Sequence, residues 1–116
     1  MPEGREVVYH IKKAIWRVDG AYYALRHMHP AIALDILSGA VTSLVVVADR
    51  AKDPRVKRKA QEERERLGRL DAELEERLMR HYYDGARLDV ADIAKELRAA
   101  HDRLLTLYKL AVTGYE

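Results

Sequence analysis

Two side chains with the chemistry of a functional site lie in stripes that are otherwise apolar. His101 falls within 97-LRAAHDRLLTLYKLAV-112, where apolar residues recur every three or four positions, and Glu63 falls between Ala60 and Leu67 in a similar pattern. An imidazole inside a helical bundle can ligate a haem iron or transfer a proton. A buried carboxylate needs a partner, because burial penalises its charge. These two groups are therefore the first candidates for a site.

Helix signals divide the chain into four segments that would position these groups. The signals are a proline in a first turn, a capping aspartate before a helix and a glycine after one, and they are found at Pro30, Asp53, Pro54, Gly85 and Asp89. We expect helices over residues 5–28, 31–51, 54–83 and 89–112, joined by short connections. Short connections make neighbouring helices antiparallel. The sequence therefore predicts one domain, residues 1–116, with the fold of an all-α, antiparallel up-down-up-down four-helix bundle.

Counting residues from each turn, with a rise of about 1.5 Å per residue, gives the height of each group in this bundle. His101 comes level with Tyr22, and Glu63 comes level with Ser43 and Tyr108. We therefore expect a hydrogen bond between His101 and Tyr22, a partner for Glu63 in Tyr108 or Ser43, and an interior polar column of His101, Tyr22, Tyr108 and Glu63.

Three glycines inside the predicted helices, Gly20, Gly39 and Gly68, fall at nearly one height. A glycine inside a helix costs roughly 0.5–1 kcal/mol relative to alanine, so it indicates either close helix approach or space for a ligand.

The leading functional hypothesis is a bundle that binds a small planar ligand, such as haem, in its core. His101 would be the axial metal ligand, with further groups from Tyr22, Tyr108, Glu63, Gly39 and Ser43. A second hypothesis is an acid–base enzyme in which His101 and Glu63 are catalytic. His101 is also compatible with a purely structural role as a hydrogen-bonded core histidine.

Other residues support a self-associating interaction protein. Tyr9, Trp16 and Tyr23 repeat every seven residues on one helix face, as a homo-oligomer contact would. The basic run 50-RAKDPRVKRK-59 is typical of a solvated cluster but also suits nucleic acid phosphates. A further metal site would combine His29 and His81 with aspartates of the loop after the third helix.

Composition excludes some kinds of site and indicates where the protein is located. The chain has 116 residues, a net charge of +2 and no cysteine, which excludes disulfides and thiolate chemistry. The N-terminus lacks the apolar core of a signal peptide, so a cytoplasmic protein is expected. The apolar run 31-AIALDILSGAVTSLVVVA-48 carries Asp35, and we interpret it as a buried helix that does not contact a membrane.

Two resemblances follow from the residues. The stretch 17-RVDGAYYALRHM-28 followed by 35-DIL-37 resembles the first helices of copper-sensing bacterial repressors, but the thiolate ligands of that family are missing, so metal sensing is not expected. The whole chain resembles computationally designed helical bundles. It has a D-P helix start, no Asn, one Gln and Glu-to-Arg pairs four apart at Glu62/Arg66, Glu65/Arg69, Glu73/Arg77 and Glu76/Arg80. Hyperthermophile proteins share these features, and a thermostable protein is expected.

Overall fold

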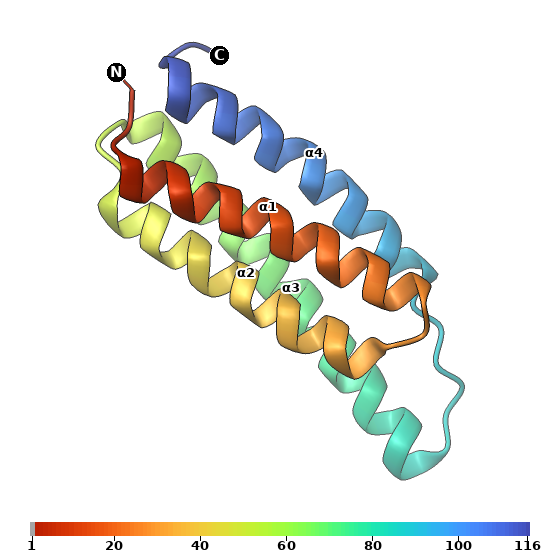
Figure 1. The fold of residues 1–116 in the computed structure, drawn as a ribbon. Helices are drawn as coiled ribbons and strands as arrows, with labels where there is room; N and C mark the ends of the chain where they lie inside the picture. The colour runs from red at the N-terminus through yellow and green to blue at the C-terminus, as the bar shows by residue number, and fades with distance from the viewer. Residues whose placement is uncertain (1) are drawn as a thin grey trace.

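The computed structural model describes residues 2–116 and consists of four α-helices. These are α1 (Arg5–Arg26), α2 (Pro30–Arg50), α3 (Pro54–Asp84) and α4 (Ala91–Thr113), and successive helices run in opposite directions (Figure 1). No strand occurs within residues 2–116. The predicted all-α four-helix bundle is confirmed.

Local signals explain where the helices begin and end. The carboxylate of Asp53 caps α3 by accepting a hydrogen bond from the backbone N–H of Arg55 at 2.9 Å, and Pro54 occupies the first turn. Gly85 ends α3 with a φ of +69°, a left-handed conformation that glycine adopts without strain. The capping position of α4 is Val90 and not Asp89, although Asp89 Oδ1 accepts a hydrogen bond from the backbone of Ala91 at 3.2 Å.

Cross-helix contacts agree with the antiparallel arrangement. Arg17 of α1 reaches Gly39 of α2, Ser38 of α2 hydrogen-bonds to Asp71 of α3 at 2.6 Å, and Arg77 of α3 pairs with α4. The molecule measures 51 × 21 × 18 Å, because the long α3 projects beyond the end of α2 (Figure 1).

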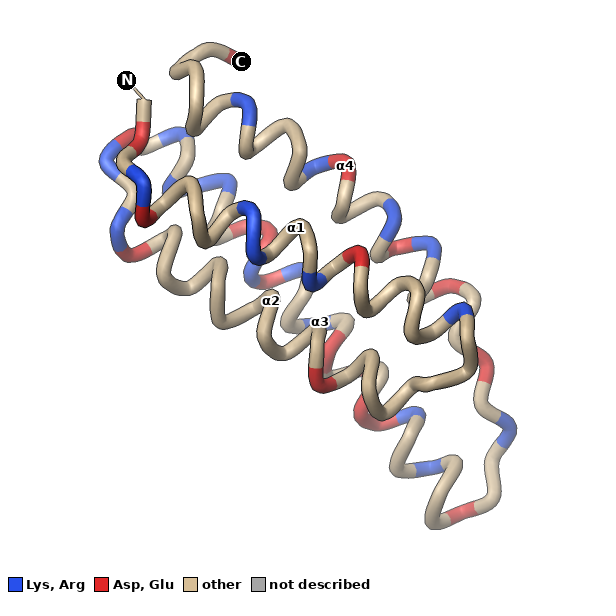
Figure 2. The backbone as a smooth tube through the Cα atoms, in the orientation of Figure 1, with Lys and Arg blue, Asp and Glu red and all other residues tan. Residues whose placement is uncertain are grey.

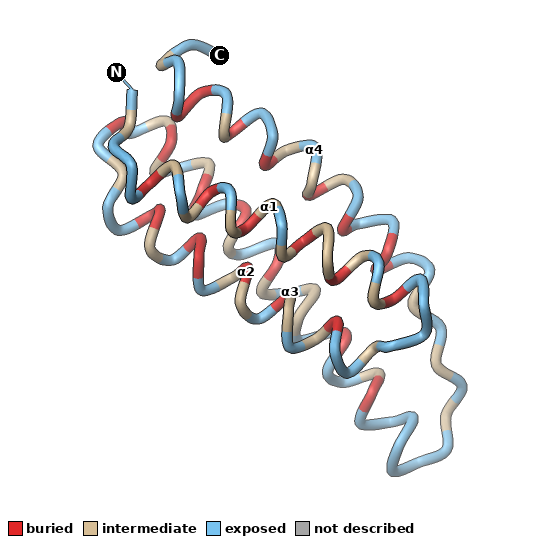
Figure 3. Tube along the Cα trace, in the orientation of Figure 1, coloured by how far each residue is buried: buried red, intermediate tan, exposed pale blue. Residues whose placement is uncertain are grey.

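The core lies along the inner faces of all four helices (Figure 3). It contains large aliphatic side chains and many alanines, and the largest side chains with almost no exposed surface include Ile11, Leu37, Leu44, Leu67, Leu74, Ile93, Leu97 and Leu104. α1 packs closely on α2 and α4, and α2 packs closely on α3, whereas α3 and α4 are the least closely packed of the four neighbouring pairs. The α3–α4 side is therefore where long polar side chains can enter between helices.

α2 is long and apolar enough to span a membrane by length and composition. In the bundle it packs against α1 and α3 and buries Ala33, Leu37, Ala40, Ser43, Leu44, Val47 and Ala48. Ile32 and Val45 lie on its exposed side.

Two aspartates at the ends of α3 and α4 make the fold sensitive to acid. The hydrogen bonds from Arg55 lower the pKa of Asp53 from 3.8 to about 2, and those from Arg77 lower the pKa of Asp92 from 3.8 to about 2. The unfolded chain binds these protons first as the pH falls. The stabilisation is therefore complete above about pH 4 and is lost as the pH falls toward 2.

We expect the urea midpoint to fall across that window. Asp92→Asn, which cannot titrate, should remove part of the fall. An unaltered acid profile in Asp92→Asn would contradict the assignment to the Arg77–Asp92 pair.

Candidate functional site

His101 lies at the edge of the bundle and not on its central stripe. The residues that α4 buries recur at Ile93, Leu97, Ala100, Leu104 and Leu107. Ala100, with no exposed surface, takes the core position that the sequence pattern assigned to His101. The His101 side chain is 27% exposed, and its Nδ1 is 3.6 Å from Oδ1 of Asp102.

The two tyrosines of the predicted polar column lie along the seam between α1 and α4. The hydroxyl of Tyr22 accepts a hydrogen bond from Arg26 at 3.2 Å, and the guanidinium of Arg98 lies 5.0 Å from the centre of its ring. Lys12 lies 5.7 Å from the ring of Tyr108. The expected hydrogen bond between His101 and Tyr22 is absent among these contacts, so that expectation is corrected: the tyrosine instead contacts arginines.

Glu63 is buried as its position predicted, but its partners are different. It is 3% exposed, and its Oε1 accepts hydrogen bonds from Arg66 Nη1 at 3.0 Å and from Arg103 Nε. Neither Tyr108 nor Ser43 is bonded to it. Its second oxygen, Oε2, is buried with no hydrogen-bond partner. Arg66, expected to pair with Glu62, pairs with this carboxylate.

Gly39 and Ser43 have a structural role at the α1–α2 interface. Arg17 Nη1 donates to the Gly39 carbonyl and to Ser43 Oγ, each at 2.9 Å. A Cβ on Gly39 would lie 3.1 Å from Arg17 Nε, so the missing side chain makes room for this arginine. Gly20 faces Ile36 across the same interface, whereas Gly68 faces open space. The three glycines do not line one cavity.

The predicted polar column is therefore not formed. Because Arg103 faces α3 while Arg98 and Tyr108 face α1, the helical period places His101 on the α1 side of α4. Glu63 and His101 lie on different sides of α4, and the structure does not bring them together.

A pocket of about 160 Å³ opens beside Glu63 between α3 and α4. It is lined by Lys59, Glu62, Glu63, Arg66, Arg103, Thr106 and Leu107. A shallower hollow of about 420 Å³ adjoins it, sharing Arg66 and Arg103 and adding Arg69, Leu70 and Glu96. Arg66 and Arg103 therefore lie between an inner pocket, which contains the carboxylate of Glu63, and an outer hollow, which contains the guanidinium of Arg69. We call the two together the Glu63 site.

The sequence pattern does not predict Arg66 and Arg103 as members of this site. A signal for Arg66 was present, because residues three apart on a helix lie side by side and a carboxylate in an apolar stripe needs a cation. Arg103 had no comparable signal, because its contact depends on where α4 crosses α3.

The histidines do not gather at a metal site. Nδ1 of His27 is 2.8 Å from the Tyr23 carbonyl, and Nδ1 of His81 is 2.8 Å from the Ala86 carbonyl. Within residues 2–116 no group of three or more His, Asp or Glu side chains is placed to hold a metal ion. The site expected from His29, His81 and the neighbouring aspartates is therefore not assembled.

Half of the six basic residues in the run 50–59 are paired with acidic groups. Lys and Arg gather near the α2–α3 turn (Figure 2), but Arg50 contacts Glu6 at 2.9 Å, Arg55 contacts Asp53 at 2.7 Å and Lys59 contacts Glu116 at 3.2 Å. These pairs reduce the charge that this end offers to a nucleic acid.

Scans against family models, curated proteins and solved structures give no match for this chain.

Proposed function

We propose that the protein binds a small molecule at the Glu63 site, and that the ligand carries both a hydrogen-bond donor and an anionic group. The observation behind this proposal is the buried carboxylate of Glu63, a residue that lines a pocket and whose Oε2 has no hydrogen-bond partner. Because Oε2 is itself covered, a ligand would reach it only after a small shift of Arg66 or Arg103. A buried acceptor without a hydrogen bond is costly, and a donor from a ligand removes that cost.

The anionic group of the ligand is suggested by the arginines around the carboxylate. The side chains of Arg66 and Arg103 are 46% and 35% exposed, and each uses only one N–H on Glu63, so both have further N–H groups to offer a ligand. Arg69 adds a third guanidinium in the outer hollow. Guanidinium groups bind carboxylates and phosphates through paired hydrogen bonds.

The size of the inner pocket sets the size of the ligand. A dry cavity of about 150 Å³ is known to hold a benzene molecule, so a pocket of this volume admits roughly six heavy atoms. An aminocarboxylate fits this description best: its ammonium would bond to Glu63 Oε2 and its carboxylate would lie among Arg66, Arg69 and Arg103.

Calorimetric titration with three probes of increasing length, glycine, 4-aminobutyrate and 6-aminohexanoate, tests the proposal. Acetate, butyrate and hexanoate are the matched controls without an ammonium group. We expect one aminocarboxylate to bind about tenfold more tightly than its control, because a charge-assisted hydrogen bond contributes roughly 1.5–3 kcal/mol. Glu63→Gln should abolish that preference, and Glu65→Gln, which removes an equal charge from an exposed position, should not. Equal binding of each pair, or no binding at all, would contradict the proposal.

Haem ligation by His101 is a second proposal, supported by one contact. Oδ1 of Asp102 lies 3.6 Å from Nδ1, beyond hydrogen-bond distance, and a small shift that closed this gap would orient the imidazole so that Nε2 could bind a metal. It ranks below the first because Ala100 fills the neighbouring core position, which leaves haem the α1–α4 seam. The test is a hemin titration in which a Soret shift appears and is lost in His101→Ala; no shift in the wild-type protein would rule it out.

A further inference from the structure

The outer face of α1 carries a row of exposed aromatic side chains. Tyr9, Trp16 and Tyr23 are 51%, 62% and 52% exposed, and they are seven residues apart, which is almost two helical turns. We call these three residues the aromatic stripe. No other helix covers this side of α1, which lies at the front of the bundle with exposed positions along its length (Figure 3). A row of exposed aromatic residues on a folded domain indicates a contact surface.

The spacing of the stripe is symmetric about its centre. Tyr9 and Tyr23 lie about 10 Å on either side of Trp16 along the helix axis. A twofold axis that passes beside Trp16, perpendicular to α1, therefore places the aromatic stripe of a second copy against the first, running in the opposite direction. In an antiparallel pair of α1 helices, Trp16 meets Trp16 and Tyr9 meets Tyr23 of the second copy.

The charges beside the stripe favour the same arrangement. Lys12 and Asp19 lie about 40° and about 60° from Trp16 around the helix, both in the same direction, and about 6 Å and 4.5 Å from it in opposite directions along the axis. Neither forms an ion pair within residues 2–116. The twofold axis brings Lys12 beside Asp19 of the second copy, and does so twice. A parallel pair would instead put the two lysines on opposite flanks at one height and the aspartates about 10 Å further along the axis, so no opposite charges would meet.

The area of the stripe predicts a weak contact. At about 150–250 Å² for each buried aromatic residue, the half-exposed stripe supplies roughly 300 Å² per copy. Stable interfaces bury about 1,200–2,000 Å² in total, so the flanking residues must contribute and the dimer must depend on concentration.

We propose that α1 is a homodimer interface, in which two copies pack antiparallel through the aromatic stripe with Lys12 and Asp19 paired across the twofold axis. This goes beyond the proposed ligand site, which lies between α3 and α4 and is not needed for it.

Sedimentation equilibrium and tryptophan fluorescence test this dimer on the intact chain. The protomer mass is 13.4 kDa, and Trp16 is its single tryptophan, so its emission reports on this contact alone. Over about 1 μM to 1 mM, which brackets a weak dimer, we expect the mass to rise toward twice the protomer value. The emission should shift to the blue with the same midpoint. A constant protomer mass, or a doubled mass with unchanged emission, would overturn the proposal.

Charge exchange tests the register. Lys12→Glu and Asp19→Lys should each weaken the dimer about tenfold, since each places like charges together. The double exchange should restore it. Failure of the double variant to recover would overturn the antiparallel register.

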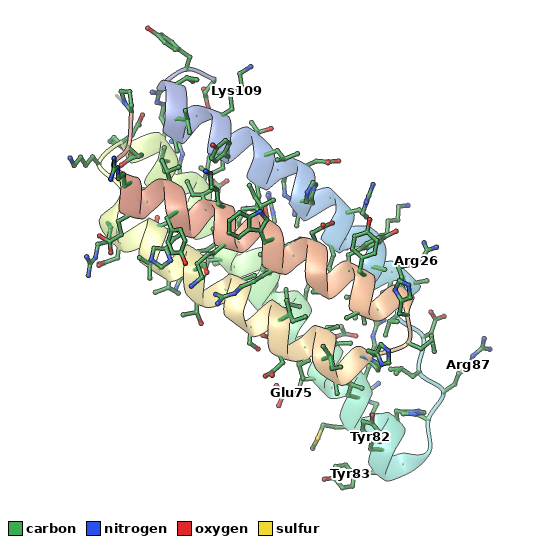
Figure 4. The ribbon with its side chains drawn as sticks, viewed as in Figure 1. Arg26, Glu75, Tyr82, Tyr83, Arg87 and Lys109 are labelled. Carbon is green, nitrogen blue, oxygen red and sulfur yellow. The ribbon has the colours of Figure 1, made fainter. Side chains whose placement is uncertain are left out.

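Two aromatic substitutions give the matched control. Trp16→Lys should weaken the dimer about thirtyfold or more, the size expected for a central aromatic residue. Tyr83→Lys, at the far end of α3 and 78% exposed, should leave it unchanged (Figure 4). Circular dichroism confirms that both variants fold, and a loss of dimer in Tyr83→Lys instead would place the contact elsewhere.

Discussion

Glu63→Ala is expected to lower the free energy of unfolding by about 3 kcal/mol, whereas Glu63→Leu should leave it within about 1 kcal/mol of the wild type. Alanine removes the partner of two arginines and enlarges the pocket. Removing one partner of a buried ion pair costs about 3–5 kcal/mol, but Arg66 and Arg103 are partly exposed and can turn toward water, which places the cost at the lower end. Leucine refills the space between Ala60 and Leu67, so burial of its side chain offsets the lost ion pairs.

Urea unfolding of the three proteins measures this difference, and the aminocarboxylate titration on the same samples measures binding. Both substitutions should abolish the preference for an ammonium group, because neither side chain accepts a hydrogen bond. A leucine variant as unstable as the alanine variant would show that the Glu63 ion pairs hold α3 to α4. In that case the carboxylate would have a structural role and the binding proposal would lose its main support.

The helices could be predicted from the sequence because their signals act over a few residues. A carboxylate at Asp53 caps the next turn, Pro54 fits a first turn, and Gly85 adopts the left-handed conformation that ends a helix. These effects need no knowledge of the neighbouring helices. The predicted start of α4 is wrong by one residue, because Val90 and not Asp89 occupies the capping position.

The site could be predicted only in part because it depends on how helices face one another. Counting residues predicts the height of Glu63 but not the direction in which it points, so Tyr108 and Ser43 are predicted as partners although the carboxylate bonds to Arg66 and Arg103. Long side chains are also hard to place from the sequence, because they reach across helices, as Arg103 of α4 does when it bonds to the Glu63 carboxylate of α3. The exposed aromatic stripe was easier to predict, because exposure follows from the helical period alone.

Ala100 and His101 show why the sequence does not predict which face of α4 points into the core. Ala100 and His101 both continue a helical stripe from Leu97 to Leu104, so periodicity does not choose between them. In the bundle the small residue enters the core and the histidine stays at the edge, half-buried. Alanine fits there because it allows α4 to approach its neighbours closely.

Leu104→Ala is expected to lower the free energy of unfolding by about 3 kcal/mol, and the neighbouring Leu105→Ala by less than about 1 kcal/mol. The two changes remove the same atoms and have the same effect on helix propensity, so they differ in burial alone. Leu104 has no exposed surface, while Leu105 is 46% exposed. For a chain of this length the larger loss corresponds to roughly 12 °C in melting temperature.

His101→Ala completes this test. Truncating a histidine at the edge of the bundle should lower the free energy of unfolding by less than about 1 kcal/mol. Calorimetric melting of the three variants, supported by urea unfolding, measures all the differences under one condition. Comparable losses in Leu104→Ala and Leu105→Ala, or a large loss in His101→Ala, would show that α4 is rotated by one residue about its axis relative to this structure. That rotation would return His101 to the core and turn Arg103 away from Glu63, so the same measurement decides whether the haem proposal or the aminocarboxylate proposal has the better-placed residue.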